Sequence, residues 1–131
     1  MRQFLDTSIL VRYLTGEPEE QAARVTVLLR SGGTLWATEA ALLETAHVLE
    51  KEYGYTRDAV VGAMITLIRE PFLQLHGLEY YSLLQALLFC RGSRRVSFGD
   101  AFIWAAAFAD RGEVYSFDQR FPREEVTVRE P

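Results

Sequence analysis

The sequence has few of the features that mark secreted or membrane proteins. It contains a single cysteine, Cys90, so the chain cannot form an intramolecular disulfide, which agrees with a reducing compartment. No apolar run is long enough to span a bilayer, and no basic amino terminus precedes an apolar region of the signal-peptide type. We therefore expect a cytoplasmic location. Cys90 ends the apolar run 87–90, so we expect a buried thiol and not a nucleophile.

Lysine is also scarce, because only Lys51 is a lysine among the 14 basic residues and the others are all arginine. The net charge of −4 argues against a protein that holds nucleic acid by bulk electrostatics. Arginine is nevertheless the side chain suited to bidentate phosphate contacts, and a compositional bias of the source genome explains the ratio equally well. Charge alone therefore leaves the partner open.

The rest of the composition predicts a single α/β domain over residues 1–131. Hydrophobic residues make up 49% and charged residues 24% of the chain, as in ordinary globular proteins, and there is no repeat or linker. Apolar runs alternate with segments of helical periodicity. They predict strands near 2–5, 34–37, 72–75, 113–117 and 126–128, and helices near 9–14, 16–30, 39–53, 56–68, 78–89 and 101–109.

Four acids stand near strand ends or on helices. Asp6 follows the first strand, which we expect to be buried, and Asp118 follows the fourth. Ligands bind at the carboxyl ends of the strands in an open parallel sheet. Asp100 begins a helix between two parallel strands, so its position is expected over the same edge. A helical wheel of residues 39–53 places Glu44 beside small residues on the inward side, whereas Glu50 is expected at the surface.

Each acid has a simpler structural explanation when it is taken alone. Asp6 or Thr7 can cap the following helix, and Ser97 with Asp100 can form a capping box. Four carboxylates at one edge, however, repel one another unless a cation neutralises them. Oxygen ligands without cysteine or paired histidine favour Mg²⁺ or Mn²⁺ over zinc. We therefore predict a divalent metal site formed by Asp6, Glu44, Asp100 and Asp118.

At these residues the chain resembles PIN-domain ribonucleases. The resemblance rests on Asp6-Thr7-Ser8, on Glu44 within a helix, on Asp100-Ala101 opening an alanine-rich helix, and on Ser116-Phe117-Asp118. Ser116 stands where many members have threonine, which keeps the hydroxyl. The size and order of the elements look most like the VapC-type toxins of bacterial toxin–antitoxin pairs.

This resemblance implies a fold, a reaction and partners. The fold is a three-layer α/β/α arrangement with a five-stranded parallel sheet in the order 3-2-1-4-5. The reaction is cleavage of structured RNA with Mg²⁺ or Mn²⁺ at the acids. The partners are a second copy of the chain, forming a homodimer, and a cognate antitoxin protein.

The predicted chemistry assigns a role to each residue. Asp6, Asp100 and Asp118 would hold one or two metal ions, with Glu44 as a further ligand or as an orienter of water. Three hydroxyl residues would fix carboxylate rotamers or contact phosphate, namely Thr7, Ser8 and Ser116.

Three other classes of protein are alternatives to a nuclease. A receiver domain needs an acceptor Asp after the third strand, where this chain has His76 and Gly77, and a Lys after the fifth, whereas Lys51 lies in a helix. An acyl-phosphate hydrolase of the Asp-x-Asp type needs a second Asp where this chain has Ser8. A non-catalytic PIN-like scaffold or regulatory binding module remains the alternative.

Overall fold

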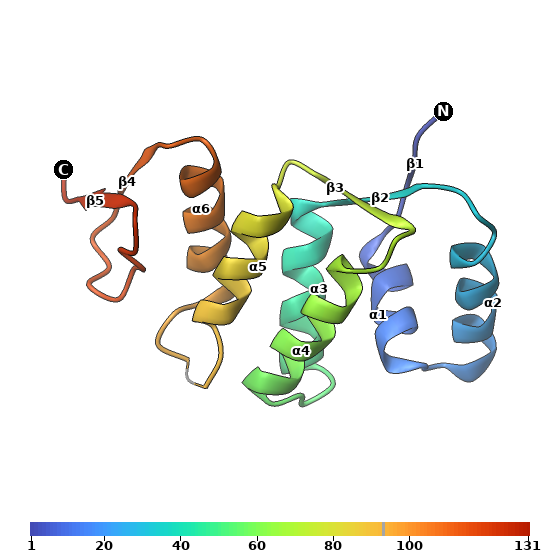
Figure 1. The fold of residues 1–131 in the computed structure, drawn as a ribbon. Coiled ribbons are helices and arrows are strands. Elements are labelled where there is room, and N and C mark those ends of the chain that lie inside the picture. Colours follow the sequence, from blue (N-terminus) through green and yellow to red (C-terminus); the bar gives the residue numbers. More distant parts are fainter. Residues whose placement is uncertain (93) are drawn as a thin grey trace.

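A computed structural model describes residues 1–92 and 94–131 (Figure 1). Every helix and strand in it overlaps one predicted from the sequence. The helices are α1 (Thr7–Thr15), α2 (Glu19–Leu29), α3 (Glu39–Lys51), α4 (Arg57–Ile68), α5 (Tyr80–Phe89) and α6 (Phe98–Ala109). The strands are β1 (Gln3–Phe4), β2 (Leu35–Thr38), β3 (Leu73–His76), β4 (Glu113–Tyr115) and β5 (Thr127–Arg129).

The predicted five-stranded sheet is wrong. The strands form a three-stranded parallel sheet in the order β1-β2-β3 and a separate parallel pair, β4-β5. The 3-2-1 half of the predicted order is therefore present, but β4 does not pair with β1. β1 is only two residues long, and β4 forms its backbone hydrogen bonds with β5. This pairing continues one residue past β4, because the Ser116 N–H donates to the Arg129 carbonyl at 2.9 Å. Figure 1 shows β4 and β5 beyond α6, at the end of the molecule away from β1.

The prediction that the first strand is buried is also wrong. Burial alternates along β2 and β3, so one face of the sheet packs on the core while the other is open. Phe4 lies on the open face and is 50% exposed. Its ring packs against Trp36 and His76, with centroid distances of 6.3 and 5.5 Å, and Arg2 lies over the Trp36 ring. Within residues 1–92 and 94–131, no helix covers this open face of β1, β2 and β3, in contrast to the outer helical layer that the resemblance implies.

Helix α3 is the centre of the core. It packs against α1, α4 and α6, and α5 packs against α6. Its buried face consists of Ala41, Leu42, Thr45, Ala46 and Leu49. The one polar member satisfies its hydroxyl within the helix, because Thr45 Oγ1 donates to the Ala41 carbonyl at 2.7 Å. No helix in the described part of the chain is long and apolar enough to cross a membrane.

The amino terminus of α6 is held in place by an ion pair between Arg57 and Glu50. Glu50 was expected at the surface, yet its side chain is only 5% exposed and accepts a hydrogen bond from Arg57 Nε at 3.0 Å. Arg57 also donates to the Val96 carbonyl at 2.8 Å and lies 4.3 Å from the centre of the Phe98 ring. The guanidinium thus joins α3 and α4 to the first residues of α6.

Candidate active site

Asp6 is the amino-terminal cap of α1. Its carboxylate accepts hydrogen bonds from the Ser8 hydroxyl at 2.7 Å and from the Ser8 N–H at 3.2 Å. These two bonds, the hydroxyl first, hold the pKa of Asp6 below its ordinary value, and the charge of Arg12 acts in the same direction. The capping alternative is therefore present in the structure, and Ser8 donates both of these hydrogen bonds to the carboxylate. Thr7 contributes a weaker backbone hydrogen bond to Asp6.

Asp100 and Asp118 lie close enough for their carboxyls to interact. Asp100 is half-buried in the first turn of α6, and Asp118 follows β4. Burial raises the pKa of Asp100, and the charge of Asp118 and a side-chain hydrogen bond to it raise this pKa further. The same bond helps to lower the pKa of Asp118. The two shifts have opposite directions, so Asp118 loses its proton more readily than Asp100.

The local backbone holds both members of this carboxyl pair. Ser97 caps α6, and its hydroxyl oxygen accepts from the Asp100 N–H at 3.0 Å. Asp118 accepts from the Arg120 N–H at 2.8 Å, which is the largest cause of its lowered pKa. Ser116 contributes through the backbone, because its hydroxyl oxygen accepts from the Asp118 N–H at 3.0 Å. Each acid is thus oriented by its immediate neighbours in the sequence.

The inward orientation predicted for Glu44 is wrong. Glu44 is exposed, together with Ala40, His47 and Lys51 on the same side of α3. The helical wheel was read with the wrong face of α3 toward the core, because the buried face is centred on Leu42, Thr45 and Leu49. The edge of His47 does contact Phe98 of α6, with ring centroids 6.4 Å apart, so this exposed face of α3 adjoins the start of α6.

The four predicted acids do not converge into one cluster. Helix α3 packs against both α1 and α6, so it separates the helix capped by Asp6 from the helix that carries Asp100. Within residues 1–92 and 94–131, no group of three or more His, Cys, Asp or Glu side chains is placed to hold a metal ion. The physical reason is that β4 is paired with β5 and not with β1, so the two strand ends do not share an edge. The catalytic roles of the four residues remain predictions.

The donors that are present fit a hard divalent cation by their chemistry. Two carboxylates close to each other repel unless a proton or a cation neutralises part of their charge. Asp100 and Asp118 influence each other in this way, and all of their donor atoms are oxygen. When both are ionised, the two groups would offer oxygen ligands to Mg²⁺ or Mn²⁺.

Sequence reasoning missed two basic residues beside the acids. Arg120 Nε lies 3.5 Å from Asp118, and Arg12 Nη1 donates to the Ser8 carbonyl at 3.1 Å. Both could have been found from spacing, because Asp118 is a turn-forming residue two positions before Arg120, and Arg12 lies one helical turn after Ser8.

The chain matches one known family of protein domains over most of its length. Residues 4–125 match the PIN domain. None of the curated proteins matches the chain.

Proposed function

The chain belongs to the PIN domain family, and from this premise we propose that it is a Mg²⁺- or Mn²⁺-dependent endoribonuclease and the toxin of a toxin–antitoxin pair. PIN domains are generally metal-dependent nucleases, which makes hydrolysis of a phosphodiester bond the reaction class. The proposed protein is a single PIN domain that acts on structured RNA in the cytoplasm as a homodimer and is inhibited by a cognate antitoxin. The size and order of its elements, which resemble VapC-type toxins, support these last points.

The observation that carries the nuclease proposal is the contact between Asp100 and Asp118. The chain places two acids against each other across 18 positions of sequence, although like charges in contact are unfavourable. An arrangement that costs stability in this way is typical of a functional site. The capped start of α6 and the turn at Asp118 hold the two carboxyls in position before any ligand arrives.

In this proposal each residue has a defined task. Asp100 and Asp118 would hold the cation, whereas the further predicted ligands Asp6 and Glu44 lie apart from this pair in the structure. A bound divalent cation supplies an acidified water and neutralises charge that develops on the phosphate. Ser8 keeps the Asp6 carboxylate ionised and fixed, and Ser97 keeps Asp100 at the first turn of α6. Arg120 holds Asp118 through its backbone N–H.

The test is cleavage of RNA by the purified protein, with and without metal. We expect cleavage of transfer RNA or ribosomal RNA fragments with Mn²⁺ or Mg²⁺ and none in EDTA. Asp100→Asn should abolish cleavage, whereas Asp110→Asn, which changes an exposed acid at the other end of α6, should retain it. Cleavage that continues unchanged in EDTA would refute the metal mechanism.

A thermal melt reports metal binding without any substrate. A ligand at 100 times its dissociation constant stabilises the folded state by about 2.7 kcal/mol, so Mn²⁺ should raise the Tm of the wild type by several degrees. The shift should be lost in Asp100→Asn and kept in Asp110→Asn. Equal shifts in all three proteins would remove Asp100 from the metal site.

The separation of Asp6 and Glu44 from the pair favours the second candidate, a non-catalytic PIN-like scaffold or regulatory binding module. This candidate predicts a protein that binds RNA or a partner but shows neither cleavage nor a Mn²⁺-dependent rise in Tm. The two assays above therefore distinguish the candidates.

A further inference from the structure

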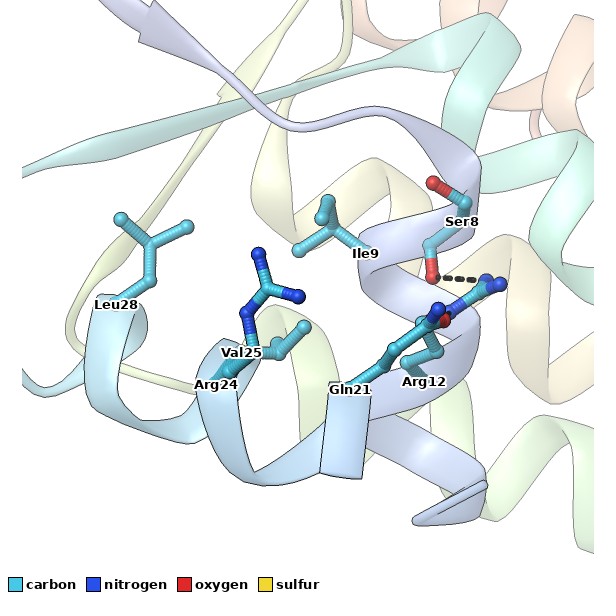
Figure 2. Close-up of a pocket in the computed structure, with 7 residues that line it drawn as sticks. All are labelled: Ser8, Ile9, Arg12, Gln21, Arg24, Val25 and Leu28. Atoms are coloured by element: carbon cyan, nitrogen blue, oxygen red, sulfur yellow. Dashed lines mark hydrogen bonds between the residues drawn. The ribbon is translucent and has the colours of Figure 1, made fainter. Parts of the chain in front are cut away.

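A pocket with a volume of about 460 Å³ lies between α1 and α2, next to the cap of α1 (Figure 2). Its floor is aliphatic and is formed by Ile9, Val25 and Leu28. Its polar lining consists of Ser8, Arg12, Gln21 and Arg24. Figure 2 shows Arg24 extending from α2 into the space between the two helices.

The two arginines of this pocket form no ion pair within the described part of the chain. Arg12 donates to neutral acceptors, the Gln21 side-chain oxygen and the Ser8 carbonyl. Arg24 has no hydrogen bond or ion pair to any residue in the described part of the chain, and no acid lines the pocket. By contrast, the side chains of Arg57, Arg94, Arg120 and Arg129 each lie within 4.0 Å of a carboxylate. In a chain with a net charge of −4, this is a local site of opposite sign.

The pocket adjoins Asp6 through Ser8. The hydroxyl of Ser8 binds Asp6, and its carbonyl binds Arg12, so one residue belongs to both. Arg12 lies about 9 Å farther along the axis of α1 than Asp6, at a rise of 1.5 Å for each of six residues. An extended strand of nucleic acid with one phosphate near Asp6 would therefore place a neighbouring unit over this pocket.

We propose that the pocket between α1 and α2 is an RNA subsite that binds one backbone phosphate through Arg12 and Arg24 and packs the attached nucleoside on Ile9, Val25 and Leu28. This proposal rests on the proposed ribonuclease function. The guanidinium fork matches phosphate geometry, and arginine planes also stack on unpaired bases. An aliphatic floor under two cations suits a nucleotide, which carries an anionic group and a flat apolar face on adjacent atoms.

The subsite can be tested by binding alone, in EDTA, so that cleavage does not interfere. A short fluorescein-labelled single-stranded RNA is titrated with wild type, Arg12→Gln, Arg24→Gln and Arg69→Gln, and fluorescence anisotropy gives the affinity. Arg69→Gln is the matched control, because it makes the same change of charge at an exposed residue that does not line the pocket. Unchanged melting curves show that each variant is folded, and Arg24→Gln decides the result if Arg12→Gln does not fold.

The expected result is a change in salt dependence as well as in affinity. Each phosphate contact to a single strand contributes about −0.7 to the slope of log K against log salt, so Arg24→Gln should lose about 0.7 from this slope. The affinity gap between wild type and variant should then narrow about 2.6-fold between 50 and 200 mM salt. Arg69→Gln should keep the wild-type slope. Equal slopes in wild type, Arg24→Gln and Arg69→Gln would overturn the subsite.

Two further measurements separate the possible failures. If a labelled oligoglutamate peptide binds more tightly than the RNA and depends on Arg24, the pocket receives an acidic protein segment and the RNA proposal is overturned. Cleavage with Mn²⁺ is measured independently. RNA binding that depends on Arg24, without any cleavage, supports the subsite and refutes the nuclease. Cleavage together with RNA binding that is the same in Arg24→Gln supports the nuclease and overturns the subsite.

Discussion

Removing the guanidinium of Arg57 should be among the most destabilising single changes in this chain. In Arg57→Met the Glu50 carboxylate, whose side chain is 5% exposed, loses its partner at 3.0 Å. Removal of one member of a buried pair costs about 3–5 kcal/mol, because the remaining charge stays desolvated. The Val96 carbonyl and the face of Phe98 lose a contact in the same step. Arg94 lies 4.0 Å from Glu50 but is 69% exposed, so it replaces little of this interaction.

This loss of about 3–5 kcal/mol is large compared with the total free energy of unfolding of a small domain, which is about 5–15 kcal/mol. For a chain of this length about 4 °C of Tm corresponds to 1 kcal/mol, so Arg57→Met should melt roughly 12–20 °C below wild type. Chemical denaturation followed by circular dichroism measures the free energy of unfolding directly. Arg129→Met is the control, because the Arg129–Glu113 pair is more than half exposed on both sides and should contribute about 0–1 kcal/mol.

A double-mutant cycle identifies the cause. If the unpaired carboxylate is responsible, then Arg57→Met/Glu50→Met should be more stable than Arg57→Met alone, since a buried ion pair can be replaced by apolar side chains at little cost. Additive losses in the double variant, or a loss of less than about 1 kcal/mol in Arg57→Met, would show that the pair does not hold the start of α6.

Three further predictions concern single groups. Ser97→Ala should cost about 1 kcal/mol, because the Asp100 N–H loses its acceptor at 3.0 Å, and an unchanged free energy of unfolding would argue against the cap. The Cys90 thiol, which is fully buried and has its pKa raised to about 11 chiefly by burial, should react with a thiol reagent at pH 8 only as fast as the protein unfolds; immediate labelling of the native protein would contradict this. Tyr13 has its pKa raised to about 12 by burial and by its bond to Glu70, so the folded state binds more protons than the unfolded state above pH 10, and stability should fall from pH 10 to 12. Tyr13→Phe should lose less stability than wild type over that range, and identical pH profiles would refute the assignment.

The elements of the fold could be predicted from the sequence because their signals are local. Helix periodicity and a cap such as Ser97 depend on neighbouring residues only. The apolar neighbours of Cys90 likewise predicted that its thiol is buried, and the structure confirms this. Pairing between strands is not local. Strands of two and three residues carry too little pattern to specify which neighbour they bind, so the expected contact between β1 and β4 was wrong.

In the candidate site, too, features set by local sequence could be predicted, and features set by the packing of separate elements could not. The contact between Asp100 and Asp118 and the bond between Ser8 and Asp6 follow from positions at helix starts and turns. The orientation of Glu44 depended on which side of α3 meets the core, and a helix with small residues on several sides gives a weak answer. Glu50 was misplaced for a related reason, since its partner Arg57 lies on the next helix and no pattern within α3 indicates it.

Capping and catalysis, which the sequence presented as alternatives, are compatible at Asp6 and at Asp100. A cap places a carboxylate against the free N–H groups of a first turn, where the positive end of the helix favours the ionised form. At Asp6 the bonds from Ser8 do this and lower the pKa, so the group is a ready anionic ligand. At Asp100 the cap is Ser97, which leaves the carboxyl free to interact with Asp118, and burial and the charge of Asp118 raise its pKa. The pKa values of Asp6 and Asp100 are therefore shifted in opposite directions, and a cation that binds at Asp100 would act against this upward shift.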